Sequence, residues 1–219
     1  MQKRKADVIR KATQVFSLYG PRTANMNQVA TKAGVSKRTL YKMFPAKEYL
    51  VVAVAEQLIK KNNQFSRVCR SMSPNALIEL KNLFVHINNL LLQTPPHFVI
   101  EIKKYYQEAY QILEKYSHNM VTDFIRKNME RGMTEGIYRS GIETQATGHL
   151  YYWLLRMTTE DMSLGKANIP GVVASIHDFF IHGVINAEGE KLLRIIQTSD
   201  RAPGTHTDGR NERFTTPNS

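Results

Sequence analysis

Residues 25–47 read NMNQVATKAGVSKRTLYKMFPAK, and the order of capping residues and glycine in them predicts two short helices joined by a tight turn. Asn25 is a favourable N-cap, and Gln28 three residues later completes a capping box that starts the first helix. Gly34 supplies the left-handed backbone conformation that ends a helix, and Ser36 is a second N-cap. This stretch therefore predicts a helix-turn-helix.

The second of these helices has two unlike faces. Leu40 and Phe44 lie one turn apart on the face that must be buried, and Val35, just before the cap, forms a hydrophobic staple with Leu40. The opposite face carries three cations and a phenol, namely Lys37, Arg38, Tyr41 and Lys42. A helix with such a face is shaped to enter the major groove of DNA.

Lys47 stands at the start of the next long helix, where a cation opposes the helix dipole. A phosphate bound there would remove that conflict, because a helix N-terminus attracts anions. The alternative is a solvated surface lysine. Because a capped helix-turn-helix lies directly before Lys47, we favour the phosphate contact.

Positive charge is concentrated in the same part of the chain. The 219 residues carry a net charge of +11, with a pI near 9.7. Residues 1–50 hold eleven Lys and Arg against Asp7 and Glu48, which gives +9 and leaves +2 for the remaining 169 residues. A polyanionic partner is therefore expected at the N-terminal end.

Three sequence runs carry a likeness to a known family. They are AxxxFxxxG from Ala12 to Gly20, VAxxAGVSxxTLYxxF from Val29 to Phe44, and KEYL from Lys47. Together they resemble the N-terminal DNA-binding domain of TetR-family transcriptional regulators. Ala46 departs from the pattern, since relatives commonly have a capping Ser, Asn or Asp there. The resemblance covers about the first 50 residues and implies a dimeric, all-α regulator.

We expect nine residues to form the DNA-binding site. Lys37 and Arg38 should approach base edges, and Asn27 is a further candidate for that role. The phosphate contacts are expected from Tyr41, Lys42 and Lys47. The full set is Asn25, Asn27, Ser36, Lys37, Arg38, Thr39, Tyr41, Lys42 and Lys47.

Helical periodicity continues along the chain and predicts an all-α fold. A helix is expected over residues 1–19, and the basic residues Lys3 to Lys5 at its start either reach phosphates or a minor groove or form a disordered tail. A long helix begins at Ala46, and Ser73-Pro74 opens another that ends at Pro95-Pro96. Residues 97–134 are expected as helix in two pieces. The expected division is a helix-turn-helix domain (1–47), a helical ligand-binding and dimerisation domain (48–197) and a disordered tail (198–219).

The helix expected over residues 143–164 is apolar on two faces and therefore needs two burial partners. A loop bracketed by Gly165 and Pro170 separates it from one further apolar stripe. The resemblance implies that these two helices pair with their copies in a four-helix bundle, while burial inside a monomer is the alternative. The expected interface residues are Tyr152, Leu155, Ile176 and Phe180.

A ligand pocket in the C-terminal body is implied by the same resemblance. Aromatic and Met side chains could line it, although each of them could equally pack in the core. The candidates are Phe84, Tyr105, Tyr106, Tyr110, Trp153 and Met157.

No pattern points to catalysis, a cofactor or a metal. The chain has no Walker loop, no GxGxxG or GxSxG motif and no HExxH, and its single Cys69 excludes an internal disulfide. His177 and His182 are five residues apart, which turns them off a common helix face. No apolar run is long enough to span a bilayer, and the charged start is not a signal peptide.

The expected protein is thus a cytoplasmic, non-enzymatic, homodimeric repressor that binds a pseudo-palindromic operator and is released by a small apolar or aromatic ligand. One alternative is a DNA-binding regulator without small-molecule input, which acts through a protein partner or as an activator. A helical enzyme on a DNA-binding head is a third, and it would need a cluster of ionisable groups that the sequence does not display.

Overall fold

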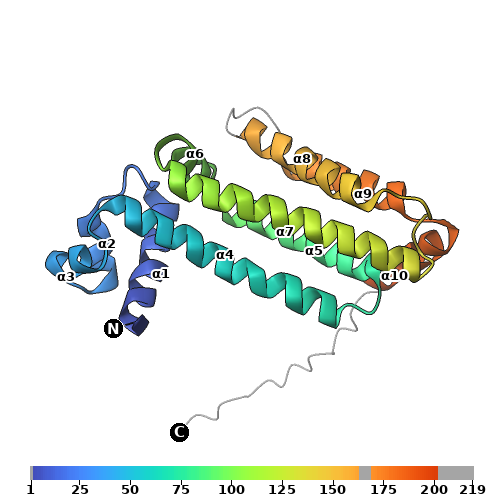
Figure 1. The fold of residues 1–219 in the computed structure, drawn as a ribbon, viewed down its shortest axis with the longest axis horizontal. Coiled ribbons are helices and arrows are strands. Elements are labelled where there is room, and N and C mark those ends of the chain that lie inside the picture. The colour runs from blue at the N-terminus through green and yellow to red at the C-terminus, as the bar shows by residue number, and fades with distance from the viewer. Residues whose placement is uncertain (1, 163–168, 202–219) are drawn as a thin grey trace, which may run out of the picture.

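The computed structural model describes residues 2–162 and 169–201, and the helices and strands assigned there are all α-helices. The prediction of an all-α fold is confirmed. Figure 1 shows a head at one end, from which a long helix leads along an extended body. The helices are α1 (Gln2–Tyr19), α2 (Met26–Ala33), α3 (Lys37–Met43), α4 (Lys47–Met72), α5 (Ala76–Gln93), α6 (Pro96–Tyr105), α7 (Gln107–Thr134), α8 (Thr144–Met162), α9 (Ile169–Val184) and α10 (Ala187–Arg201).

The head is built around one apolar cluster. Phe16 of α1, Leu40 of α3 and Leu50 of α4 are buried in it, together with Phe44 at the end of α3. The cluster also includes side chains from far along the chain, namely Phe98, Ile102, Tyr106 and Ala109. The head therefore shares its core with α6 and with the start of α7, and it is not joined to the body by α4 alone.

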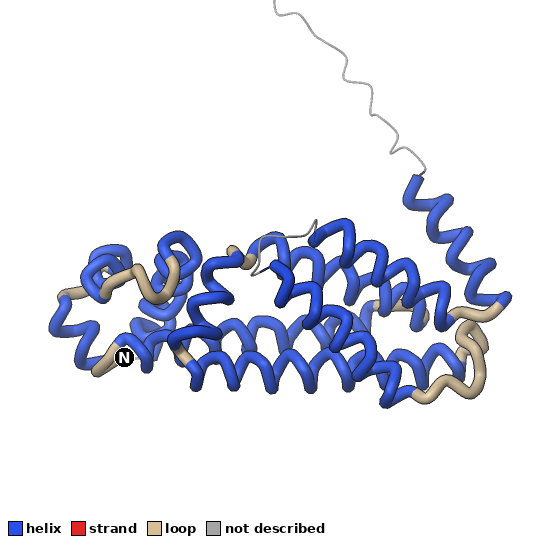
Figure 2. Tube along the Cα trace, turned by 90° about the horizontal axis from the view of Figure 1, so that it is seen from above, coloured by secondary structure: helices blue, strands red, loops and turns tan. Residues whose placement is uncertain are grey.

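The body has a second core, in which α7 is the central helix. It packs against α4, α5, α6 and α8, and α8 packs in turn against α9. Leu80 and Leu83 of α5, Ile125 of α7 and Tyr151 of α8 are buried in this core. Figure 2 shows α10 leaving the end of the body far from the head at an angle. No helix in residues 2–162 or 169–201 is both long and apolar enough to cross a membrane.

A partly buried arginine with two carboxylate partners fixes the far end of the body. Arg131 of α7 contacts the carboxylate of Glu79 at 2.7 Å and that of Glu135 at 2.6 Å, and it donates to the carbonyl oxygen of Ser73 at 3.0 Å. Glu135 also accepts from the backbone N–H of Ala76 at 2.7 Å, at the N-terminus of α5. A carboxylate at a helix N-terminus is favourable. The contacts of Arg131 and Glu135 therefore hold the start of α5 against the end of α7.

Several expected boundaries differ in the structure. Lys3 to Lys5 lie inside α1 and do not form a disordered start. The N-cap of α5 is Asn75, whose side chain accepts from the N–H of Ile78 at 2.9 Å, because Ser73 instead donates its hydroxyl to the carbonyl oxygen of Cys69. The last helix runs to Arg201 and so enters the segment expected to be a tail, while residues 202–219 and the loop at Gly165 lie outside the described residues. The division of residues 97–134 into two helices is confirmed, but the break lies at Tyr106, so that Tyr110, which we expected in the first piece, belongs to the second.

Candidate nucleic-acid interface

The helix-turn-helix has the local geometry that the sequence predicts. The Asn25 side chain accepts from the N–H of Gln28 at 3.0 Å, and the Gln28 side chain accepts from the N–H of Asn25 at 2.8 Å, which completes the capping box. Gly34 ends α2 with a φ of +63°, a conformation that costs other residues free energy. The Ser36 hydroxyl accepts from the N–H of Thr39 at 3.1 Å and so caps α3.

The two faces of α3 are separated as expected. Leu40 and Phe44 are buried in the head core, and Val35 packs partly buried against it. The other face is open to solvent and presents Lys37, Arg38, Tyr41 and Lys42. The ammonium of Lys37 lies 6.0 Å from the centre of the Tyr41 ring, so these two side chains share one patch. This patch is the strongest candidate surface for a DNA groove in the described chain.

The nine predicted residues fall into three groups. The first group is exposed and consists of Asn27 of α2 and the four side chains of the cationic face of α3. Asn25, Ser36 and Thr39 use their side chains inside the protein, because the first two cap helices and the Thr39 hydroxyl lies 2.8 Å from that of Ser36. Their role is to fix the turn, which leaves less of their hydrogen-bonding capacity for DNA.

Lys47 forms the third group, and it is not the freely solvated lysine that we considered as the alternative. Its Nζ donates to the carbonyl oxygens of Arg22 at 2.7 Å and Ala24 at 2.8 Å, both in the loop between α1 and α2. Burial lowers the pKa of the ammonium, and the nearby carboxylates of Glu48 and Glu101 oppose that effect. One of the three ammonium N–H groups remains for a phosphate.

The same loop is held from the body by residues that the sequence did not reveal. Glu101 of α6 accepts from the backbone N–H of Arg22 at 2.7 Å, and the Arg22 side chain donates to the Tyr105 hydroxyl at 2.5 Å. The Tyr106 hydroxyl donates to the carbonyl oxygen of Pro21 at 3.0 Å. Because some 80 residues separate the two sides of these contacts, no local pattern predicts them.

The six aromatic and Met residues proposed as pocket lining do not meet in one place. Tyr105 and Tyr106 lie at the head, and Tyr110 packs partly buried against the head core. Phe84 is buried in the body core, while Trp153 and Met157 are exposed on α8. Some of the six are therefore core residues and others are surface residues. The sequence could not tell them apart, because helical spacing identifies an apolar stripe but not the element that covers it.

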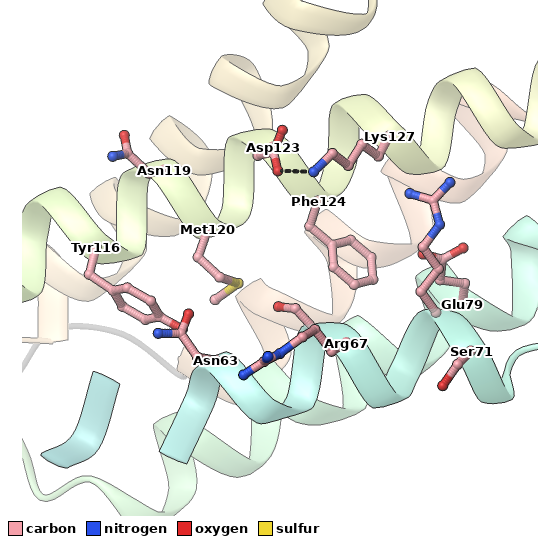
Figure 3. Close-up of a pocket in the computed structure, with 12 residues that line it drawn as sticks. Asn63, Arg67, Ser71, Glu79, Tyr116, Asn119, Met120, Asp123, Phe124 and Lys127 are labelled. Carbon is pink, nitrogen blue, oxygen red and sulfur yellow. Dashed lines mark hydrogen bonds and ion pairs between the residues drawn. The ribbon is translucent and has the colours of Figure 1, made fainter. Parts of the chain in front are cut away.

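A cavity of about 610 Å³ lies instead between α4 and α7 (Figure 3). Met120 and Phe124 point into it from α7, facing Asn63 and Arg67 of α4. Its other lining residues are Ser66, Arg70, Ser71, Glu79, Tyr116, Asn119, Asp123 and Lys127. Its volume suits a small molecule.

The exposed surface of α8 and α9 is unusually apolar. Phe179 is 82% exposed and Trp153 60% exposed, and Leu150, Met157 and Val172 are exposed with them. A groove of about 590 Å³ follows these helices and is lined by Leu150, Val172, Phe179 and others. Contiguous exposed apolar side chains mark interaction surfaces.

Two of the four predicted interface residues line this groove, although Phe180 is itself buried in the body core, and two do not line it. Ile176 and Phe180 line the groove between α8 and α9. Tyr152 is buried and donates its hydroxyl to Glu114 at 2.7 Å, and Leu155 packs against the core of its own protomer. The expectation for Tyr152 is therefore corrected, since it is buried in the protomer, whereas Leu155 is half-buried against the body core in the same way as Ile176.

Residues 8–54 match the sequence profile of the bacterial regulatory proteins of the tetR family. An uncharacterized HTH-type transcriptional regulator, YvaF of Bacillus subtilis strain 168, is 33% identical over 92 residues, which are 42% of this chain and 48% of that protein. The chain thus matches about half the length of this curated relative. Both descriptions name transcriptional or regulatory proteins, in agreement with the regulator that the sequence predicts.

Solved structures of similar fold extend over most of the chain. A TetR-family transcriptional regulator from Agrobacterium tumefaciens has a TM-score of 0.67 at 12% identity, covering 84% of this chain and 99% of its own. A transcriptional regulator from Cytophaga hutchinsonii has a TM-score of 0.67 at 19% identity, covering 82% and 97%. Both the head and the helical body therefore have counterparts in regulators of known structure.

Proposed function

We propose that this chain, which belongs to the TetR family of bacterial transcriptional regulators, represses its target genes as a homodimer that a small molecule releases from an operator. The observation that supports this most directly is the exposed patch of Lys37, Arg38, Tyr41 and Lys42 on a helix that is capped at its start and followed at its end by a buried phenylalanine. Its place of action is the cytoplasm, where bacterial DNA lies.

In this proposal α3 enters the major groove, where Arg38 and Lys37 contact base edges. Arginine suits this role because its planar guanidinium bonds two acceptors of guanine at once. Lys42 and Tyr41, near the end of α3, contact phosphates, and the remaining N–H of Lys47 does the same at the start of α4. Asn27 of α2 contributes a further polar contact.

The dimer forms through the apolar surface of α8 and α9, where Phe179 and Trp153 of each protomer become covered. A two-fold pair of heads then reads two half-sites, with α3 and its copy about 34 to 36 Å apart, one turn of B-DNA. A pseudo-palindromic operator follows from that symmetry. We retain residues 1–47 as the DNA-binding domain and 48–197 as the ligand-binding and dimerisation domain, and extend the latter to Arg201, where α10 ends.

A small molecule releases the DNA by binding the body in the cavity between α4 and α7. Since α4 begins at Lys47 and contributes Leu50 to the head core, a ligand against α4 has a direct connection to the head. The ligand must bind more tightly to the conformation whose head spacing does not fit the operator, because only differential affinity shifts the equilibrium.

The test is binding of the purified protein to the DNA that flanks its own coding region, at two salt concentrations and against excess random DNA. Tight binding to one pseudo-palindrome that survives the competitor is the expected result. Weak binding with a steep salt dependence and no sequence preference would contradict the proposal. It would show that the head binds the phosphates of any DNA and does not recognise a sequence.

A further inference from the structure

We infer that the cavity between α4 and α7 binds an amphipathic organic anion, with Arg67 and Arg70 holding the anionic group and Met120 and Phe124 contacting the apolar part. This inference rests on the proposed function, because it names the chemical class of the effector.

The charges that line the cavity are not balanced. Its two carboxylates already have partners, since Glu79 is paired with Arg131 at 2.7 Å and Asp123 with Lys127 at 2.6 Å. Arg67 and Arg70 are exposed and have no ion pair within the described part of the chain. They lie three residues apart on α4, which places them on one side of that helix. An anion in the cavity therefore meets two guanidinium groups that no protein carboxylate neutralises, and a guanidinium fits a carboxylate in a two-bond geometry.

The opposite wall is apolar. Phe124 is almost fully buried, and Met120 packs partly buried against the same core. Figure 3 shows both side chains directed from α7 toward α4, where they face Asn63 and Arg67. Methionine and phenylalanine offer contact area without polar groups, and a flexible Met adapts to the shape of its partner. A ligand that fills the cavity therefore needs an apolar part that contacts α7 and a charged group that contacts α4.

Two residues at the cavity also carry hydroxyl groups that are buried behind its surface, so a ligand would reach them only if these side chains turned. The Ser66 Oγ of α4 and the Tyr116 hydroxyl of α7 are buried, and neither has a hydrogen-bond partner in the structure. A buried polar group without a partner destabilises the fold, and the cost disappears when a ligand or water supplies the bond. Burial raises the pKa of the Tyr116 hydroxyl, so it remains a proton donor at neutral pH and suits an oxygen acceptor.

The test compares two carboxylates with their own amides by isothermal titration of the full-length protein without DNA. The probes are 2-naphthoate with 2-naphthamide, and octanoate with octanamide. Each pair keeps its apolar part and differs in charge. At least one carboxylate is expected to bind about tenfold more tightly than its amide, the range for a hydrogen bond to a charged group. If 2-naphthoate binds more tightly than octanoate, the effector is aromatic, and the reverse order indicates an aliphatic effector.

The double variant Arg67→Gln/Arg70→Gln should remove the preference for the carboxylate. The matched control is Lys60→Gln/Lys61→Gln, which removes the same charge from exposed positions of α4 outside the cavity and should leave the preference unchanged. Equal binding of acid and amide, no binding of either carboxylate, or an equal loss in the control variant would each overturn the inference. Failure of operator binding, with carboxylate binding intact, would instead overturn the proposed function alone.

Discussion

The Nζ of Lys47 lies 2.7 Å from the carbonyl oxygen of Arg22, and this hydrogen bond ties the first residue of α4 to the loop between α1 and α2. Glu101 of α6 holds the backbone N–H of the same Arg22 at 2.7 Å. Gly20 begins the loop with a φ of +83°, and a Cβ there would collide with the carboxylate of Glu101. The orientation of the head is therefore fixed from two sides, by α4 and by α6.

Replacing Lys47 with alanine should weaken binding to operator and random DNA alike, because the lost contact is to phosphate and carries no sequence information. It should also lower the free energy of unfolding by about 1 to 3 kcal/mol, since the partly buried carbonyl oxygen of Ala24 and the exposed one of Arg22 both lose a charged donor. Filter-binding assays and urea unfolding measure the two effects.

The matched control is Lys42→Ala, an exposed cation of α3 that has no partner among the described residues. It should weaken DNA binding to a similar degree and leave the urea midpoint unchanged. If Lys47→Ala altered stability no more than Lys42→Ala does, the link between α4 and the loop would contribute little in solution.

Arg38→Ala should mainly reduce discrimination between operator and random DNA, by about 1 to 3 kcal/mol for one lost two-bond contact to a base. The ratio of the two dissociation constants at fixed salt is the measurement, because affinity alone varies with salt. A uniform loss on both DNAs, as predicted for Lys42→Ala, would assign Arg38 to the phosphate backbone.

Phe179→Glu should convert the dimer into a monomer. The side chain is 82% exposed in the protomer, and a carboxylate placed inside an apolar interface is strongly unfavourable when no cation pairs with it. Sedimentation velocity measures the mass, and operator binding should fall with it, since one head reads only half a site.

Leu92→Glu is the control for that experiment, because Leu92 is equally apolar and exposed but lies on α5, away from the groove of α8 and α9. It should remain dimeric. A dimeric Phe179→Glu variant would show that the apolar surface of α8 and α9 serves another partner.

Protein stability should decrease as the pH falls from about 6.5 to 4. His177 is stacked on Phe84 at a ring distance of 4.0 Å, and burial lowers its pKa to about 4. Between its unfolded value and this folded value, the unfolded chain binds the proton and the native protein does not, so acid favours unfolding. The loss approaches about 3 kcal/mol near pH 4.

Urea unfolding of the His177→Phe variant at pH 7 and pH 4.5 measures this effect. Phenylalanine keeps an aromatic ring against Phe84 and removes the titrating group, so the difference between the two pH values should shrink. His182→Gln, a change at an exposed histidine of the same helix, should retain it. The expectation fails if the pH dependence is unaffected by removal of His177.

Local chemistry allowed much of the head to be predicted from sequence. The caps at Asn25 and Ser36 and the glycine at position 34 act through neighbours within a few residues, so their geometry is readable before any tertiary contact is known. The cationic side of α3 followed from helical periodicity, because its opposite face must be buried. Binding of DNA by that surface stays a prediction.

The body was predicted less well, because periodicity identifies an apolar stripe but not the element that covers it. Tyr152 and Phe180 were assigned alike to an interface, yet Tyr152 faces Glu114 inside the protomer whereas Phe180 lines the outer groove. Tyr105 and Tyr106 were expected at a ligand and instead hold the head. These assignments depend on how the helices are rotated against one another.

The sequence by itself determined the helical fold, the helix-turn-helix and the concentration of charge at one end, since each depends on residues close together in the chain. Only the tertiary structure decided that Lys47 and Glu101 hold one loop between them, and that Arg67 and Arg70 of α4 border a cavity walled by Met120 of α7. The physical reason is that these contacts join residues tens of positions apart, and the packing of whole helices, not the local preference of the backbone, brings them together.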